Sequence, residues 1–289
     1  MDSPAKPRVV VLLGTNYSGS HLLSHLTSAH SACLGVGELH RYQTLLATGG
    51  TAPVVSVYKT QPVFAGLETL PATEWHSVLS ARFGEATGVA QPVIIDNSKK
   101  VKWVKRITDG TDYDVRLVHL IRDPRALVLR WLNTYDSEKR RRTQRMRVAK
   151  RMPARSPQIL AGDWVTVFVY KWLRENRQIS DFIVKRGLPH AVVTYHDMVF
   201  HTEAMLHRLM PNLGLEFEPG QLAFGENEHY GTVKTEHADA IKKSEIRPDL
   251  KWQTQLDGSA AAHVVSNTDV QKYLASLDLR CGEKGLVRL

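Results

Sequence analysis

The sequence predicts an α/β fold: a single domain of three layers, in which a central, mainly parallel sheet is flanked by helices. Short apolar segments alternate with longer segments of helical periodicity, as in chains built from repeated strand and helix units. Polar and charged residues directly follow the apolar segments, at the places where parallel strands end. The chain has 289 residues, 43% of them apolar, and neither a repeat nor a linker divides it. We therefore expect one domain over residues 1–289, with residues 1–7 flexible.

The first expected strand, Val9–Leu13, runs into a polar turn, Gly14–Gly19, and then into a helix, Ser20–Ala29. Backbone N–H groups in such a turn, together with the helix dipole, form a site for a phosphate or sulfate group. The two glycines have the spacing of a P-loop, which makes the predicted fold one of P-loop type. Ser20 stands where an ATPase carries Lys, which argues against ATP hydrolysis. The alternative is that the glycines only form a tight turn.

Three further apolar segments are expected to be strands, and each is followed by residues suited to binding or catalysis. Glu38 and His40 also come soon after the first helix, where the segment Cys33–Glu38 runs through two glycines, and we expect them near the same edge of the sheet. The strands are Val93–Ile95 before Asp96-Asn97-Ser98-Lys99-Lys100, Val115–Ile121 before Arg122-Asp123-Pro124-Arg125, and Ala191–Thr194 before Tyr195-His196-Asp197-Met198. The expected helices are residues 72–83, 102–108, 163–185, 202–210 and 269–277, with another beginning near Pro124, and residues 49–62 are expected to be a loop.

The net charge of +9 indicates an anionic ligand or partner. Eight Lys and Arg residues against one Glu lie in Glu138–Arg151, and we expect residues 138–157 to be a basic helix or flap near that ligand. The segment has no aromatic side chain for stacking on bases, so we do not expect nucleic-acid binding. Cys33 and Cys281 are expected to be reduced and structural. Without an apolar span or leader, we expect a cytoplasmic protein that binds no membrane; a homo-oligomer is left open.

In their order and spacing these motifs resemble the sulfotransferases that use 3′-phosphoadenosine 5′-phosphosulfate (PAPS), particularly the bacterial and the carbohydrate or tyrosylprotein branches. The resemblance extends from Val9 to about Leu256. Gly14–Ser20 lies where that family has its 5′-phosphosulfate loop, and Arg122-Asp-Pro-Arg-Ala126 is similar to its 3′-phosphate motif. Further elements of the family are similar to Asp96-Asn-Ser-Lys99, Trp172 with Asn176, Tyr195-His-Asp-Met198, and the segments His229–Lys234 and Ile246–Trp252.

The resemblance implies transfer of a sulfuryl group from PAPS to a hydroxyl or amine of an acceptor, a small molecule or carbohydrate, without a metal. It assigns Lys99 to the departing oxygen, with Lys100 as a contender and a merely solvated Lys99 as the alternative. Either Glu38 or His40 would be the base, and the resemblance favours Glu38. A carboxylate needs a raised pKa for this role, whereas the ordinary pKa of an imidazole is already suitable. The implied nucleotide contacts are Thr15, Asn16, Tyr17, Ser18, Gly19, Ser20, His21, Arg122, Arg130, Tyr195 and Lys234.

The chain departs from the family pattern at three positions. Tyr17 occupies the place of the loop's cation, Arg130 replaces a Ser eight residues after Arg122, and Leu39 replaces a second Glu of the tyrosylprotein branch. A second guanidinium at Arg130 could hold the 3′-phosphate bidentately. Tyr17 leaves open a protein that binds PAPS or its product PAP, 3′,5′-diphosphoadenosine, without transfer; a P-loop kinase is the less favoured alternative.

Three histidines complete the sequence-based predictions. His21 and His25 lie four residues apart on one expected helix face, a spacing that suits a metal ion. The carboxylate of a metalloprotease motif does not accompany them, so we expect no metal there. His119 lies inside an expected strand and should be packed or hydrogen-bonded in the core.

Overall fold

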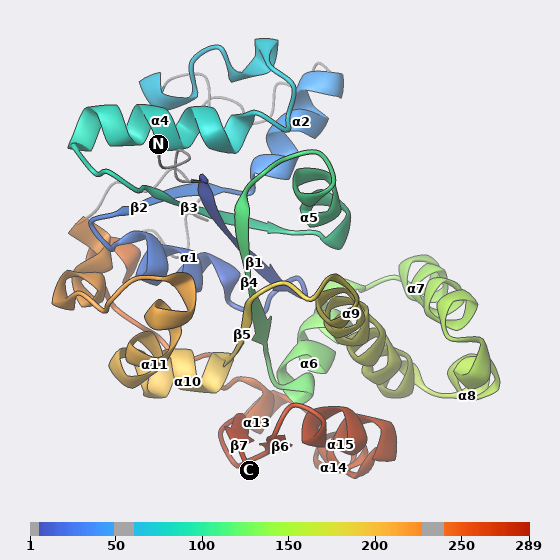
Figure 1. Ribbon diagram of the computed structural model, residues 1–289. Coiled ribbons are helices and arrows are strands. Elements are labelled where there is room, and N and C mark those ends of the chain that lie inside the picture. The colour runs from blue at the N-terminus through green and yellow to red at the C-terminus, as the bar shows by residue number, and fades with distance from the viewer. Residues whose placement is uncertain (1–5, 49–60, 227–239) are drawn as a thin grey trace.

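The computed structural model describes residues 6–48, 61–226 and 240–289. Five strands form the central sheet in the order β2-β3-β1-β4-β5, and all four pairings are parallel (Figure 1). The carboxyl ends of these strands therefore share one edge, as predicted. The strands are β1 (Arg8–Gly14), β2 (Cys33–Gly37), β3 (Val93–Lys99), β4 (Asp114–Ile121) and β5 (His190–Thr194). Strand β2 was not predicted, and neither was a separate antiparallel pair, β6 (Leu279–Cys281) and β7 (Leu286–Arg288).

The prediction for β3 was too short. The strand continues past Ile95 to Lys99, because β1 and β2 pair with it beyond its apolar part; Leu13 of β1 still pairs with Lys99. The polar segment Asp96-Asn97-Ser98 consequently lies within the sheet, and all three of these side chains are buried. Polar composition alone suggested that the strand had already ended.

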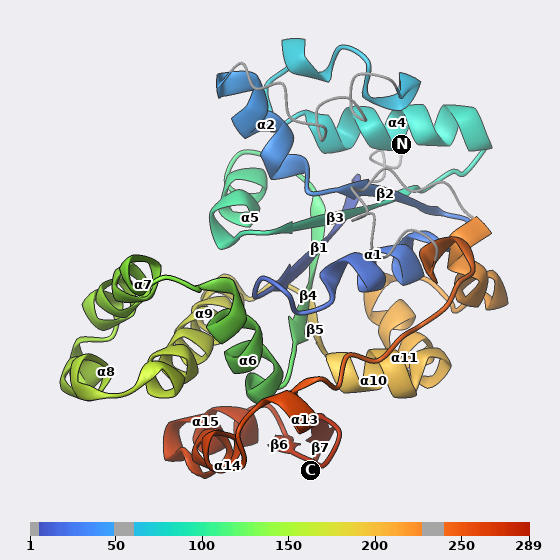
Figure 2. The same cartoon turned by 180° about the vertical axis from the view of Figure 1, so that it is seen from behind.

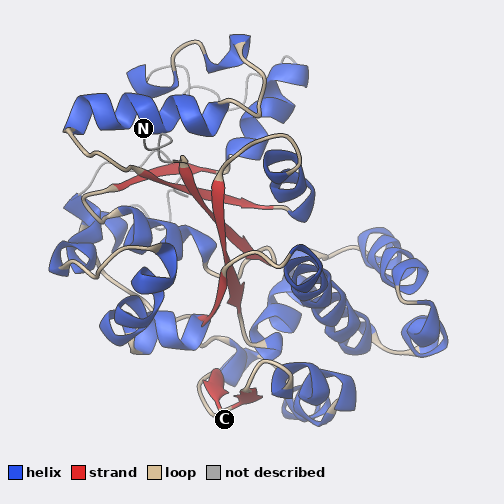
Figure 3. Cartoon of the chain, viewed as in Figure 1, coloured by secondary structure: helices blue, strands red, loops and turns tan. Residues whose placement is uncertain are grey.

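Helices cover both faces of the sheet (Figure 3). The α-helices are α1 (Ser20–Ser28), α2 (Leu39–Thr48), α4 (Trp75–Thr87), α5 (Val101–Thr108), α6 (Pro124–Thr134), α7 (Glu138–Arg151), α8 (Ser156–Ala161), α9 (Trp164–Arg186), α10 (Tyr195–Phe200), α11 (Thr202–Leu209), α13 (Trp252–Gln255), α14 (Gly258–Ser266) and α15 (Thr268–Ala275). Five 3-10 helices are η1 (Pro62–Phe64), η2 (Leu67–Thr69), η3 (Pro153–Arg155), η4 (Met210–Leu213) and η5 (Pro219–Glu226).

Local chemistry explains most of the helix boundaries. Asp123 caps α6 by accepting a hydrogen bond from the backbone of Arg125, with Pro at the first helical position. Asp163 caps α9 in the same way. Helix α4 starts and ends later than predicted: it continues through Gly84 and stops where Gly88 adopts a left-handed conformation (φ 76°).

Alternate residues of β1 point into two separate cores. Val9, Val11 and Leu13 belong to the core beneath α2, α4, α5 and the second half of α9. Val10 and Leu12 belong to the core beneath α1, α10 and α11 on the opposite face. A third core joins α6, α7, the first half of α9, α14 and α15 (Figure 2). The three-layer prediction is confirmed.

The basic segment is helical. Helix α7 buries Gln144, Val148 and Ala149, and it packs beside α9, while most of its Lys and Arg side chains are exposed. Residues 1–5, residues 49–60 of the predicted loop 49–62, and residues 227–239 lie outside the described part of the chain. Among the described residues, no helix is long and apolar enough to cross a membrane.

Candidate active site

The loop Thr15–Gly19 joins β1 to α1 at the carboxyl edge of the sheet, as predicted. Tyr17 and Gly19 both adopt left-handed backbone conformations, with φ of 71° and 98°. A Cβ atom at Gly19 would lie 2.8 Å from the ring of Tyr195, so only glycine fits. The hydroxyl oxygens of Thr15 and Ser18 are buried and have no hydrogen-bond partner among the described residues. Buried hydroxyl groups are normally satisfied, and these two are suited to donate to the oxygens of an anion.

Two arginines bracket Tyr17. Arg122 donates from Nη1 to the carbonyl oxygen of Tyr17 at 2.8 Å, and the guanidinium of Arg130 lies 4.5 Å from the centroid of the Tyr17 ring. Arg122 is nearly buried, and its Nε has no partner within the residues that the structure describes. The fold thus brings the two predicted 3′-phosphate residues against the predicted 5′-phosphosulfate loop, although they lie more than one hundred residues away in sequence.

The C-terminal segment covers Arg122. Asp249 accepts a hydrogen bond from Arg122 Nη2 at 2.8 Å, and its backbone N–H donates to the hydroxyl of Tyr195 at 3.0 Å. The Tyr195 ring lies 4.2 Å beneath the Arg122 guanidinium. Trp172 fixes Arg122 from behind by donating to its carbonyl oxygen at 2.9 Å. Sequence reasoning placed Tyr195 and residues 246–252 near the nucleotide. It did not predict that Asp249, within that segment, forms an ion pair with Arg122, the residue predicted to bind the 3′-phosphate.

The second part of the edge holds Glu38. Its buried carboxylate forms ion pairs with Lys99 and Arg41, and His21 Nε2 lies 3.8 Å from Glu38 Oε1. Burial alone raises the pKa of Glu38, but Lys99, Arg41 and His21 together hold that pKa below its usual value. Burial lowers the pKa of Lys99, whose side chain is 8% exposed, whereas Lys100 is exposed. Lys99 rather than Lys100 therefore faces the predicted base.

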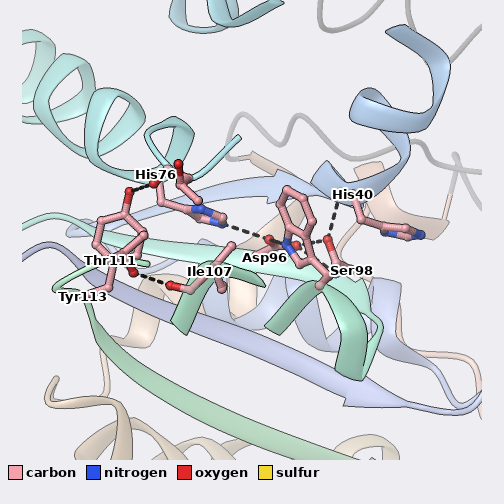
Figure 4. A network of polar contacts seen from close by, with 9 residues as sticks. His40, His76, Asp96, Ser98, Ile107, Thr111 and Tyr113 are labelled. Carbon is pink, nitrogen blue, oxygen red and sulfur yellow. Dashed lines mark hydrogen bonds and ion pairs between the residues drawn. The ribbon is translucent and has the colours of Figure 1, made fainter. Parts of the chain in front are cut away.

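A buried network fixes the end of β3 (Figure 4), the strand that carries Lys99. Asp96 is fully buried; it accepts hydrogen bonds from Ser98 N at 2.8 Å and Trp103 Nε1 at 2.7 Å, and it lies 2.9 Å from His76 Nε2. Lys99 follows with a left-handed backbone (φ 59°). His76 and Trp103 were missed by sequence reasoning: the helix that carries His76 showed no recognisable chemistry, and no spacing rule links it to Asp96, 20 residues later.

His40 joins the same network through its backbone. Its N–H donates to Ser98 Oγ at 3.1 Å, while the imidazole points away from Ser98 (Figure 4). Burial lowers the pKa of the half-buried His40. Both candidate bases, Glu38 and His40, therefore lie at the ends of β2 and β3, next to Lys99.

The remaining predicted residues lie as follows. His119 is buried, with Nε2 3.2 Å from Asn176 Oδ1, and is a core residue as predicted. Burial, followed by the charge of His21, lowers the pKa of His25 to about 4. In the described part of the chain, no group of three or more His, Cys, Asp or Glu residues is arranged to hold a metal ion. Lys234 lies outside the described residues.

The chain has the fold of sulfotransferase domains. The sulfotransferase domain from the curacin biosynthetic pathway superposes with a TM-score of 0.56 at 18% identity, over 95% of this chain and 98% of that domain. The sulfotransferase domain of the Synechococcus PCC 7002 olefin synthase gives a TM-score of 0.56 at 15% identity, over 94% and 96% of the two chains. No protein-family model and no curated protein matches the sequence. These similarities confirm the predicted fold class and the resemblance at the level of fold.

Proposed function

We propose that the protein is a sulfotransferase that moves the sulfuryl group of PAPS to a hydroxyl or amine of an acceptor. One observation carries the proposal: Arg122 of the 3′-phosphate motif is bonded to the Tyr17 carbonyl of the 5′-phosphosulfate loop. The two ends of one nucleotide would thus be held by adjoining groups. The buried donors at Thr15, Ser18 and Arg122 Nε support the proposal, because they suit phosphate and sulfate oxygens.

The proposed reaction is a single in-line displacement at sulfur. The acceptor oxygen or nitrogen forms a bond to sulfur while the bond from sulfur to the bridging oxygen breaks, and the electron pair of that bond stays on the 5′-phosphate of PAP. Lys99 would stabilise the charge that develops on this oxygen. The proton of the acceptor passes to Glu38 or His40.

The ion pair between Glu38 and Lys99 bears on the choice of base. A carboxylate with a lowered pKa is a weak base, so Glu38 can accept the proton efficiently only after Lys99 has moved toward the sulfuryl group. Burial keeps His40 neutral, and it needs no such release. We expect the variant that removes the base, Glu38→Gln or His40→Gln, to lower kcat by about 10²- to 10⁴-fold. The other variant should retain most of the activity.

Calorimetry with PAP and a turnover assay with PAPS and a panel of alcohols, phenols, amines and sugars test the function. The proposal expects PAP binding and at least one sulfated product. The absence of both PAP binding and any sulfated product would overturn the proposal. Binding without product for any acceptor would favour the alternative that Tyr17 suggests, a PAP- or PAPS-binding protein without transfer. We further propose a cytoplasmic location, supported by the free thiols of Cys33 and Cys281.

A further inference from the structure

A group of like charges lies between α7 and α9. Lys171 Nζ and Arg174 Nη2 both contact the same atom, Glu175 Oε1, the arginine at 2.9 Å. Their side chains are only 8% and 12% exposed. Arg147 and Arg151, one turn apart on the adjacent α7, add two exposed cations, and neither forms an ion pair in the described part of the chain. We call these five residues, Arg147, Arg151, Lys171, Arg174 and Glu175, the α7–α9 cluster.

The α7–α9 cluster is not neutralised. Four cations face one carboxylate, which leaves a formal charge of about +3 in a partly buried place. Burial lowers the pKa of Arg174, and the nearby charges of Arg151 and Arg147 lower it further, while Glu175 acts in the opposite direction. The Nε atom of Arg174 is buried and has no hydrogen-bond partner among the described residues. An anion at this position would supply both the missing charge and the missing acceptor.

The cluster adjoins the loop that holds Tyr17. Tyr135, at the end of α6, and Tyr17 connect them, because both pack against the core that α6, α7 and α9 share. Burial raises the pKa of the Tyr135 hydroxyl, and the nearby Glu175 and Tyr17 raise it further. The Trp131 ring of α6 packs against the cluster, with Lys171 Nζ 4.5 Å from the centroid of the ring. Helices α7 and α9 lie side by side in both views of the molecule, with α6 next to α9 (Figures 1 and 2). A molecule bound at the cluster would therefore lie next to the proposed transfer site.

We propose that the α7–α9 cluster binds a phosphate or sulfate ester group on the acceptor substrate. The inference rests on the proposed function and narrows it to an anionic acceptor. The proposed nucleotide site already has its own donors in the loop, Arg122 and Arg130, so the cluster is left for a different anion. Guanidinium groups, which two helices supply here, bind the oxygens of such esters through paired, charge-assisted hydrogen bonds. Tyr17 and Tyr135 would then lie between the anionic end of the acceptor and its nucleophile.

The test uses protein saturated with PAP, titrated by calorimetry with inorganic phosphate and, separately, with inorganic sulfate. Comparing the affinities for phosphate and sulfate shows whether the cluster prefers a phosphate ester or a sulfate ester. We expect binding to the wild type, and a loss of at least about tenfold in affinity for the double variant Arg147→Glu/Arg151→Glu. Both substituted side chains are exposed, so the variant should fold. The matched control is Lys139→Glu/Lys150→Glu, which makes the same charge change at exposed positions of the same helix. Its affinity should stay within about threefold of wild type.

If both double variants lost the same affinity for phosphate or sulfate, the inference would be overturned, because the loss would then come from the change in net charge and not from the α7–α9 cluster. Binding of neither anion to the PAP-saturated wild type would overturn it as well. Absence of PAP binding contradicts the proposed function instead. In that case the titrations are made without PAP, and the same comparison of variants decides whether the cluster is an anion site.

Discussion

The ends of β3 and β4 both present a cation at the carboxyl edge of the sheet, and they hold it in opposite ways. At β3, Lys99 is the last residue of a strand that is fixed by Asp96, which is fully buried and bonded only to buried or local groups. At β4, Arg122 is bonded to Asp249, whose side chain is 47% exposed and which lies 127 residues later in the chain.

The difference separates a fixed part of the site from an exchangeable one. Water does not reach the hydrogen bonds of the buried Asp96, so they should keep the backbone that carries Lys99 in place whether or not a ligand is bound, while the Lys99 side chain can still leave Glu38. The pair between Arg122 and Asp249 faces solvent, and an incoming phosphate offers the arginine a better partner. We therefore expect substitutions at β3 to affect stability and those at β4 to affect nucleotide binding.

The largest effect is expected at the fixed end. Asp96→Ala leaves His76, Trp103 and the backbone of Ser98 without their buried acceptor. The free energy of unfolding should fall by about 3–5 kcal/mol, measured by urea denaturation. Asp249→Asn serves as the control, because it removes a charge at the exposed pair. If the two variants lost equal stability, the distinction between the two ends would be wrong.

Acid should destabilise the protein more through His119, which is buried in β4, than through the exposed pair of Arg122 and Asp249 at the end of that strand. Burial lowers the pKa of His119 to about 4, so between pH 6.5 and 4 the unfolded chain binds a proton that the folded chain does not. Stability should fall over that range by about 3 kcal/mol for this group. Denaturation at a series of pH values should show a shallower fall for His119→Gln. An unchanged pH dependence in this variant would exclude His119 as the cause.

At the exchangeable end, Arg122→Ala should weaken PAP binding by about 2–4 kcal/mol, because a charged hydrogen bond to phosphate is lost. Calorimetry measures the change, with Lys139→Ala on the exposed side of α7 as a control for net charge. Unchanged PAP affinity in the Arg122 variant would show that the 3′-phosphate motif has been misassigned.

The smallest effect is expected for Asp249→Asn, which removes the carboxylate that competes for Arg122. An exposed ion pair contributes less than about 1 kcal/mol, so PAP should bind up to about fivefold more tightly and stability should hardly change. Calorimetry measures the PAP affinity, and thermal unfolding measures the stability. Weaker PAP binding would mean that Asp249 helps to hold the nucleotide instead of competing with it.

The parts of the site that were predictable are those tied to strand ends. Gly14–Gly19, Lys99 and Arg122 follow apolar segments, and the parallel order of the strands then requires them to lie at one edge. The partners of these residues were not predictable. Asp249 meets Arg122, and His76 meets Asp96, only because separate helices and the C-terminal segment pack in one particular way. Such contacts depend on tertiary packing and leave no periodic signal in the sequence.

The sequence motifs placed Glu38 and Lys99 at the same edge of the sheet but did not predict the contact between them. Glu38 and Lys99 were assigned separate roles, as base and cation, but the structure pairs them with each other. Sequence position says which groups share an edge; whether two opposite charges on that edge neutralise one another depends on distances of a few ångströms. These distances are set by the left-handed turn at Lys99.

Asp249 also bears on which anions reach Arg122. As a tethered carboxylate it competes at an effective concentration of order millimolar or more, whatever the concentration of the protein. A free phosphate or sulfate ion, which gains only one contact, displaces such a competitor poorly at lower concentrations. A ligand that is also held at the Thr15–Gly19 loop brings its second anionic group to Arg122 at a comparable effective concentration. We therefore expect Arg122 to bind a molecule that carries two anionic groups, one of them held at the Thr15–Gly19 loop, in preference to the single anions in solution.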